Sequence, residues 1–338
     1  MAYKISAGEF DKIVKELSNH YHVYAPCLQE GRGTFSDTDI VGYSSIQSAG
    51  KIVFDRKSMY SFKETILPIS QTLFYFTDDE MKEPRPPYGK AVVFLRNCDM
   101  HGLKRLDDIY RCDGPNKNMD FYYEQLRNNT KFIVIGCNNG FESCFCESMG
   151  TNVPADYDAY VIPEGGEYML DSRFDELTDL LKAQGSQQIE FTPKDITNTL
   201  QVTVPEEIPD SIIKSPLWDE YDARCVICGR CNFVCPTCAC FTMQDIFYDE
   251  NASAGERRRV WASCQVDGYT DIAGGIAFRK SKGERMRFKV LHKIRDHKKR
   301  FGRNMCVGCG RCDDVCPEYI SFSACIGKVL KAGGEGNG

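Results

Sequence analysis

The sequence has no long apolar segment and no excess of positive charge. None of its 338 residues belongs to a run of eighteen apolar residues, which excludes a transmembrane helix. Residues 1–17, MAYKISAGEFDKIVKEL, carry charges where a secretory signal needs an apolar stretch. The formal net charge is −6, so there is no overall electrostatic case for nucleic-acid binding. We therefore expect a cytoplasmic protein that binds neither membranes nor nucleic acids.

The sequence also lacks the usual nucleotide-binding motifs. Neither G-x-G-x-x-G at the start of a helix nor G-x-x-x-x-G-K-[ST] occurs. The pairs Gly165-Gly166 and Gly274-Gly275 are more typical of turns. Histidine is scarce, with five residues, and none forms a metal-spaced pair with a carboxylate. The sequence therefore predicts no flavin, no NAD and no substrate site on this chain.

Cysteine, in contrast, is abundant, and much of it lies in two copies of one pattern. The first copy reads CVICGRCNFVCP over 225–236, and the second reads CVGCGRCDDVCP over 306–317. Both follow C-x2-C-x2-C-x3-C-P, the run found in bacterial ferredoxins with two 4Fe–4S clusters. Clusters of this kind need thiolates, so the protein is expected in a reducing compartment.

The spacing of the two runs also predicts how the clusters are held. Gly229, Gly308 and Gly310 let the loop backbone curl and direct amides at the sulfurs. The fourth cysteine of each run is expected to open a helix and to bind the other cluster. The alternative is a pair of structural zinc sites, although zinc ligands favour C-x2-C pairs. The predicted crossed sets are Cys225, Cys228, Cys231 and Cys316 for one cluster and Cys306, Cys309, Cys312 and Cys235 for the other.

Four further cysteines predict a third metal site in the N-terminal half. Residues 91–95 and 131–135 read as buried strands, and Cys98 and Cys137 follow their C-terminal ends. Cys144 and Cys146 lie on the loop after the second strand, and open α/β sheets place their sites at this edge. We expect a third iron–sulfur cluster there. Zinc and buried free thiols remain alternatives, and Cys27 or Cys112 could replace one ligand.

These motifs predict two domains. The N-terminal domain, residues 1–205, is expected to be α/β or α+β, with a hairpin over 156–170 and an apolar, buried stretch over 65–76. Strands are expected near 22–26, 39–46 and 51–54, and helices over 8–21 and 175–183. The second domain, residues 206–330, is expected to be an α-helical, ferredoxin-like domain with two 4Fe–4S clusters. It contains an insertion of 70 residues between the runs, and residues 331–338 are expected to be disordered.

Two features of the second domain have no assigned role. Cys238, Cys240 and Cys264 lie outside both runs. The stretch 279–303 holds twelve Lys or Arg against two acidic residues. It is either a solvated helix face, a docking surface for an acidic partner, or a source of positive charge that raises a cluster potential. His101, three residues after Cys98, could also lie near a cluster.

Together these residues resemble a known family. The chain resembles the A subunit of anaerobic sulfite reductase and, more broadly, the beta iron–sulfur subunit of cytoplasmic sulfhydrogenases. The resemblance rests on the two cysteine runs with their long insertion, on Arg96-Asn97-Cys98-Asp99, and on Cys137 followed by Phe145-Cys146-Glu147-Ser148-Met149-Gly150-Thr151. Asn97 stands where a proline is expected in the hydrogenase branch, which favours the sulfite reductase branch.

The resemblance implies an electron-transfer subunit without a catalytic site of its own. A flavin subunit would oxidise NADH, this chain would conduct the electrons, and a sirohaem subunit would reduce sulfite to sulfide. One alternative is the beta subunit of a sulfhydrogenase-type NiFe hydrogenase, and another is a free ferredoxin-like carrier. The residues alone leave the terminal acceptor open.

Overall fold

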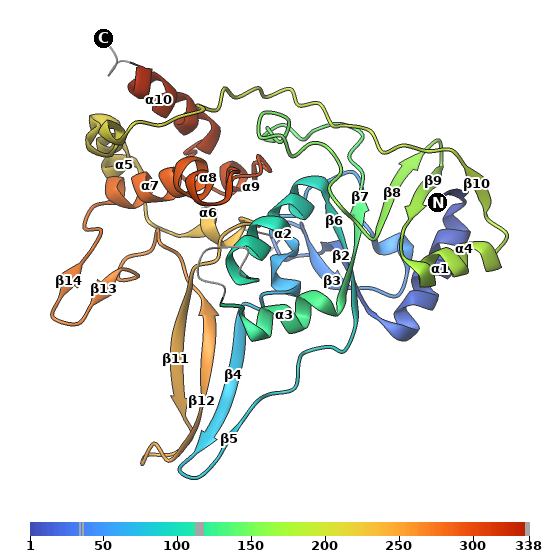
Figure 1. The fold of residues 1–338 in the computed structure, drawn as a ribbon, viewed down its shortest axis with the longest axis horizontal. Coiled ribbons are helices and arrows are strands. Elements are labelled where there is room, and N and C mark those ends of the chain that lie inside the picture. The colour runs from blue at the N-terminus through green and yellow to red at the C-terminus, as the bar shows by residue number, and fades with distance from the viewer. Residues whose placement is uncertain (34, 36, 112–117, 335–338) are drawn as a thin grey trace.

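The structure is a computed structural model that describes residues 1–33, 35, 37–111 and 118–334 (Figure 1). The elements of the first part are β1 Ala2–Ile5, α1 Ala7–His20, β2 His22–Gln29, β3 Ile40–Ser45, β4 Ser70–Thr77, β5 Met81–Lys82, β6 Ala91–Arg96, α2 Asn97–Tyr110, α3 Phe121–Asn128, β7 Thr130–Ile135, β8 Ala159–Glu164, β9 Glu167–Ser172, α4 Asp175–Ala183 and β10 Gln187–Ile189. The elements of the second part are α5 Asp219–Arg224, α6 Arg230–Phe233, β11 Phe241–Phe247, β12 Ala254–Trp261, β13 Asp271–Ile272, β14 Ile276–Ala277, α7 Lys282–Leu291, a π-helical turn His292–Asp296, α8 His297–Phe301, α9 Arg311–Asp314 and α10 Phe322–Gly334.

The first part is built on one mixed sheet of eight strands. Its order is β10-β1-β9-β8-β7-β6-β2-β3, and the neighbours β2, β6, β7 and β8 run parallel. Strand β6 reads AVVFLR and is buried along its whole length. Continuous apolar composition of this kind is expected of a parallel strand that is covered on both faces.

Helices cover both faces of this sheet. Val92 and Phe94 of β6 pack in one core with residues of α1 and α4, and Val93 and Leu95 pack in a second core with residues of α2 and α3. The alternation follows from the strand, whose successive side chains point to opposite faces. The predicted N-terminal α/β architecture is confirmed in this sheet and its two helical layers.

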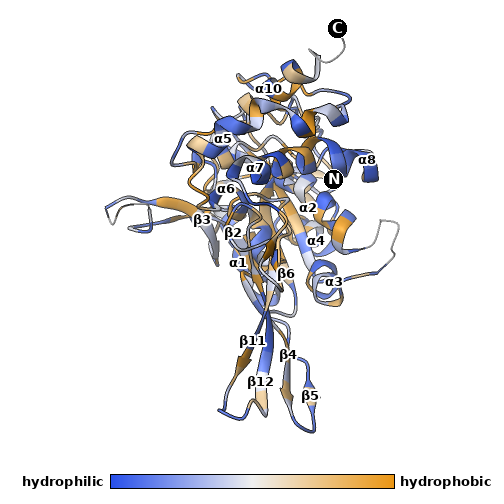
Figure 2. Ribbon diagram, turned by 90° about the vertical axis from the view of Figure 1, so that its left-hand side faces the viewer, coloured by the Kyte–Doolittle hydropathy of each residue, from blue (hydrophilic) through white to orange (hydrophobic). Residues whose placement is uncertain are grey.

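A second sheet projects from the body as an arm, visible in both ribbon views (Figure 1 and Figure 2). Its order is β11-β12-β4-β5, so strands from the insertion pair with strands from the first part of the chain. The expectation of a purely α-helical second domain is therefore wrong. Strands β11 and β12 form an antiparallel hairpin, and β4 pairs with β12 to extend it.

Two local predictions for the N-terminal part are wrong, and the arm explains the first of them. Residues 65–76 are not uniformly buried: Ile69 is 53% exposed and Tyr75 is 40% exposed. The reason is that β4 lies in the projecting arm, where most of its residues are not fully buried. Residues 51–54 form no strand, because Ala49–Lys51 is a 3-10 helix and the next residues are irregular.

The expected disorder of residues 331–338 is wrong for the first four of them. Residues 331–334 form the last turn of α10, and residues 335–338 lie outside the described part. Cys325, Ile326 and Val329 of α10 are buried in the core around Trp218, and this packing anchors the helix. None of the described helices is long and apolar enough to cross a membrane.

Candidate iron–sulfur centres

The first cysteine run forms a loop that leads into a short helix. Ile227 has φ of 49°, and its amide donates to Cys225 Sγ at 3.4 Å. Gly229, with φ of 75°, then caps α6, so Cys231 lies in the first turn of that helix. A left-handed residue before a helix turns the loop so that backbone N–H groups face the sulfurs. Cys228 on this loop is exposed.

The second run repeats this geometry. The amide of Gly308, with φ of 63°, donates to Cys306 Sγ at 3.4 Å, and Gly310 caps α9 with φ of 70°. In both runs the fourth cysteine follows the helix instead of opening one, which corrects the prediction. The glycine caps start each helix one residue before the third cysteine, and each helix ends before the fourth.

The fold brings cysteines of the two runs together crosswise. Burial raises the pKa of Cys225, and the nearby thiols of Cys231, Cys228 and Cys316 raise it further. Burial likewise raises the pKa of Cys306 to about 12, with Cys309 and Cys235 among the thiols that act on it. Helices α6 and α9 contact each other and carry the two halves of this arrangement. Each predicted crossed set therefore occupies one neighbourhood, with the fourth member supplied by the other run.

Two lysines of the basic stretch lie against these sulfurs. Lys293 Nζ is 3.5 Å from Cys235 Sγ, and its side chain is 3% exposed. Lys289 is also buried; burial opposes its charge, but the thiolates of Cys231 and Cys312 raise its pKa well above the usual value. Arg295 and Lys298 instead form ion pairs with Asp210 and Glu206. The stretch is thus not simply a solvated face, since two of its charges are directed at cysteines.

The four N-terminal cysteines also meet. Strands β6 and β7 are adjacent and parallel, Cys98 lies in the first turn of α2 directly after β6, and Cys137 follows β7. Cys144 and Cys146 on the next loop are both buried. One small cavity at the C-terminal edge of the sheet is lined by Cys98, Cys137, Cys144, Cys146, Lys57, Arg96, Gly140, Phe141, Ile196 and Arg311.

Three cations surround this cavity. Arg96 Nη1 lies 3.7 Å from Cys137 Sγ, and Lys57 Nζ lies 3.8 Å from Cys144 Sγ. Arg311 makes two hydrogen bonds to the buried carboxylate of Asp99, at 2.6 and 2.8 Å. Four thiolates around an iron–sulfur cluster carry a net negative charge, and buried negative charge needs paired cations. Four thiols at one cavity, with Arg96 and Lys57 against two of them, are a donor set of the kind that binds an iron–sulfur cluster, although Lys57 and Arg311 are also paired with Asp314 and Asp99.

The sequence alone did not reveal these cations. Lys57 is remote from every motif, and Arg311 belongs to a run in which only the cysteines and glycines have an obvious role. The one indication in the sequence was Asp99, which lies in the first turn of a helix that follows a buried strand. A carboxylate buried at this position requires a positively charged partner. Asp99 and Arg311, which are paired in the structure, lie 212 residues apart in the sequence, so the sequence gives no sign of this ion pair.

The remaining candidates have other surroundings. Cys27 packs in the core between the sheet and α1, where its thiol donates to the carbonyl of Ala25 at 3.4 Å. Cys112 lies outside the described residues. His101 Nε2 lies 3.0 Å from the carbonyl of Val153, and burial lowers its pKa to about 4. Within the described structure, neither Cys27 nor His101 lines the cavity of the four N-terminal cysteines.

Comparison with protein families agrees with the cysteine runs. Residues 224–320 match the family described as "4Fe-4S dicluster domain". The loops with amides directed at sulfur, the crossed thiols and the buried lysines fit that assignment. The chain carries two 4Fe–4S clusters.

Comparison with curated proteins gives a similarity over nearly the whole chain. The sequence is 27% identical to sulfhydrogenase 2 subunit beta of Pyrococcus furiosus, across 96% of this chain and 97% of that protein. No solved structure shows significant similarity to the chain. The chain is thus similar along nearly its whole length to the beta subunit of a sulfhydrogenase, and its residues 224–320 match a dicluster domain.

Proposed function

We propose that this chain is the electron-transfer subunit of a multi-subunit oxidoreductase and conducts electrons through three iron–sulfur centres. The observation that carries the proposal is the direct contact between the N-terminal cysteine loop and the second cysteine run. Each 4Fe–4S cluster accepts and donates single electrons, so centres in contact form a conducting series. The relative of similar length is named as a subunit, which supports assembly with partner chains.

The ligands that we assign follow the neighbourhoods of the cysteines. The first cluster takes Cys225, Cys228, Cys231 and Cys316, and the second takes Cys306, Cys309, Cys312 and Cys235. The third takes Cys98, Cys137, Cys144 and Cys146. In this assignment each run contributes three ligands to one cluster and its fourth cysteine, Cys235 or Cys316, to the other. Each run therefore connects the two clusters covalently.

The second and third sites share side-chain and backbone contacts. Lys57 Nζ donates to the carbonyl oxygen of Cys309 at 3.0 Å while it lies against Cys144. Cys144 Sγ itself lies 3.4 Å from that carbonyl oxygen. The amide of Phe145 donates to the carbonyl of Gly308 at 2.8 Å. These contacts put the ligand loops of two centres in van der Waals contact, with no intervening layer of protein.

Iron content tests the series of three centres. Anaerobically purified chain should hold about twelve irons, falling to about eight in Cys137→Ser, with the dicluster signals unchanged. Cys27→Ser, which removes a buried thiol elsewhere in the same domain, is the matched control and should keep all of the iron. About eight irons in the parent chain, with zinc or alkylatable thiols at Cys98 and Cys146, would leave only two clusters on the chain.

For the reaction of the whole complex, we propose NADH-dependent sulfite reduction. This chain would take electrons from a flavin subunit and pass them to a sirohaem subunit that reduces sulfite to sulfide. The supporting residue is Asn97, which differs from the proline expected in hydrogenase relatives. The alternative, a sulfhydrogenase-type NiFe hydrogenase, is supported by the 27% identity with a sulfhydrogenase beta subunit.

The cofactors of the co-purifying subunits decide between these reactions. Tagged chain isolated anaerobically from its native host should bring down a sirohaem protein, recognised by its absorption, and NADH-dependent loss of sulfite. Nickel in place of sirohaem, with hydrogen-dependent dye reduction, would select the hydrogenase alternative. Isolation as a monomer at native abundance would favour a free carrier.

A further inference from the structure

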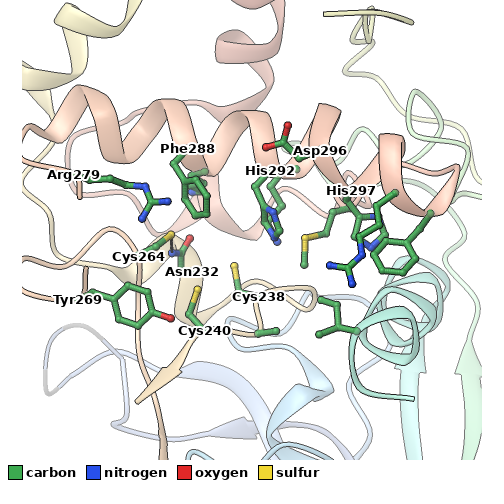
Figure 3. Close-up of a pocket in the computed structure, with 17 residues that line it drawn as sticks. Asn232, Cys238, Cys240, Cys264, Tyr269, Arg279, Phe288, His292, Asp296 and His297 are labelled. Carbon is green, nitrogen blue, oxygen red and sulfur yellow. Dashed lines mark hydrogen bonds between the residues drawn. The ribbon is translucent and has the colours of Figure 1, made fainter. Parts of the chain in front are cut away.

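An open cavity beside the cysteine runs, shown in Figure 3, has no role in the proposed function. It has a volume of about 410 Å³, within the range of small-molecule sites. Its upper wall is the basic helical stretch α7–α8, and its lower wall carries Cys238, Cys240 and Cys264, the three cysteines without a role. The sulfur atoms of these residues face the space below Phe288 and His292 (Figure 3).

Two of these cysteines, Cys240 and Cys264, lie near each other in the cavity wall (Figure 3). Interaction with the Cys264 thiol lowers the pKa of Cys240 to about 6. Interaction with the Tyr269 hydroxyl acts on the pKa of Cys240 in the same direction. The interaction between the two cysteines raises the pKa of Cys264, whose sulfur receives the side-chain amide of Asn232 at 3.1 Å. The pair therefore consists of a stabilised thiolate and an adjacent protonated thiol.

This arrangement has the chemistry of a thiol–disulfide exchange site. The thiolate is the nucleophile, and attack is fastest when the thiol pKa lies near the ambient pH. A second thiol beside the first can resolve the mixed disulfide. Cys240 is partly exposed at the cavity and can be reached from it, whereas Cys264 is 5% exposed and lies behind it.

The charged side chains that line the cavity indicate which ligand charge it favours. Arg279 and Arg300 stack over Phe288 and Phe301, at 3.6 and 5.0 Å from the ring centroids. Neither arginine forms an ion pair with a carboxylate in the described part of the chain. Asp296, the one acidic residue of the wall, is held by Arg295 at 2.7 Å. The cavity therefore favours an anion.

The backbone of the upper wall is also irregular. Residues 292–296 form a π-helical turn between α7 and α8, and His292, Lys293 and Asp296 from this turn line the cavity. Such turns are uncommon and occur frequently at functional sites. The turn changes which side chains face the cysteines, so the wall differs from that of a regular helix.

We propose that Cys240 and Cys264 form a redox-active dithiol that exchanges with a small anionic disulfide bound in this cavity. The Cys240 thiolate attacks one sulfur of the disulfide and releases the first thiolate product. Cys264 then loses its proton and attacks Cys240 Sγ, which forms the Cys240–Cys264 disulfide and releases the second thiolate product. The two electrons lost by the protein thiols are the two gained by the small disulfide.

Renewal of the dithiol rests on the proposed electron-transfer function. Lys293, which lines the cavity, lies 3.5 Å from Cys235 Sγ, so the cavity adjoins the centre that Cys235 is assigned to bind. Reduction of the disulfide to the Cys240 thiolate and the Cys264 thiol needs two electrons, which that centre is placed to pass one at a time, and one proton, which comes from solvent in the open cavity. The exchange step itself needs no cluster electrons and can be tested separately.

The test uses the anaerobic protein with its clusters and a stoichiometric amount of 5,5′-dithiobis(2-nitrobenzoate), a dianionic disulfide. We expect two equivalents of thionitrobenzoate, unchanged iron, and a Cys240–Cys264 cross-link in peptide maps. Relative to the ratio of the two rates with free dithiothreitol, the dicationic disulfide cystamine should react at least about tenfold more slowly, and Arg279→Gln should reduce this difference. Lys194→Gln, an exposed substitution outside the cavity, is the matched charge control.

Variants separate the two thiols. Cys264→Ser should stop at a mixed disulfide on Cys240, and Cys240→Ser should not react at this site. Peptide maps without the cross-link, or a ratio of the two rates equal to that measured with dithiothreitol, would overturn the proposal. Loss of iron from correctly folded Cys240→Ser or Cys264→Ser would also overturn it, because the thiols would then be metal ligands. Iron content of the parent protein tests the cluster series independently.

Discussion

The two cysteine runs have nearly the same sequence but opposite surroundings. In the first run Cys228, Val226 and Arg230 are exposed. In the second run Cys309 is 7% exposed, and Arg311, the counterpart of Arg230, is 1% exposed. One motif therefore forms both a centre near the surface and a centre inside the molecule. We infer that the first centre meets the partner chain, while the second relays electrons to the N-terminal site.

A single position in the motif reflects this difference. Ile227 and Gly308 occupy the same place in their loops, and both have positive φ. A Cβ on Gly308 would overlap the carbonyl of Phe145, because the N-terminal cysteine loop packs directly on it. Both runs have a left-handed residue at this turn. Only the buried run requires glycine there, because a side chain would overlap the N-terminal cysteine loop.

Among the predicted changes, substitution of a crossed ligand should have the largest effect, because it should remove or alter the cluster of the other run. Cys235→Ser, although it alters the exposed run, should remove or alter the centre bound by Cys306, Cys309 and Cys312. Cys316→Ser should do the reverse, since a serine hydroxyl replaces the thiolate that the cluster needs. Electron paramagnetic resonance and iron content check both variants. Damage confined to the run that carries the substitution would show that ligation is not crossed.

The next largest effect should come from replacing the arginine of each run, which should lower the folding stability in the buried run but not in the exposed run. Arg311→Met leaves Asp99 buried without its partner, which costs about 3–5 kcal/mol of folding stability. Arg230→Met, at the matched exposed position, should change stability by no more than about 0.5 kcal/mol. Thermal unfolding of the two variants at equal cluster content measures the difference. Equal midpoints would contradict the buried role of Arg311.

Gly308 should be less tolerant of a side chain than Ile227. Gly308→Ala introduces a left-handed alanine, which costs about 1–2 kcal/mol, and an overlap with Phe145 that must displace the N-terminal loop. Ile227→Ala changes neither the backbone nor a buried contact of this kind. Thermal midpoints and iron content should fall for Gly308→Ala and stay near the parent value for Ile227→Ala. Equal tolerance would mean that the two loops do not pack together.

The smallest predicted effect concerns redox potential. Lys293→Met removes a buried cation beside Cys235, which disfavours the more negative reduced form and lowers the midpoint potential of the second centre. An interaction of about 1.4 kcal/mol corresponds to about 60 mV. Lys299→Met removes an exposed charge of the same stretch and should cause a much smaller shift. A potentiometric titration with no shift for Lys293→Met would assign that lysine a purely structural role.

Several strands and helices of the N-terminal part could be predicted from the sequence alone. Ala91–Leu95 and Lys131–Ile135 are continuous apolar runs, and Asp175–Ala183 has a clear helical period, so local pattern and burial agree. Prediction failed over residues 65–76, because apolar composition does not reveal that β4 pairs with β12 in a projecting arm. For residues 279–303 the sequence left a solvated face, a docking surface and a source of positive charge near a cluster open, since buried lysines need partners that only the folded chain provides.

The sequence by itself determined which chemistry this protein can hold. The spacing of the cysteines and the glycines that shape their loops are local properties, and they indicate 4Fe–4S clusters whatever surrounds them. Only the tertiary structure decided which run is buried, which cations offset its charge, and which thiols lie in an open cavity. Lys57, Asp99 and the loop 143–146 create that environment from distant parts of the chain, because burial and ion pairing depend on contacts in space and not on spacing along the sequence.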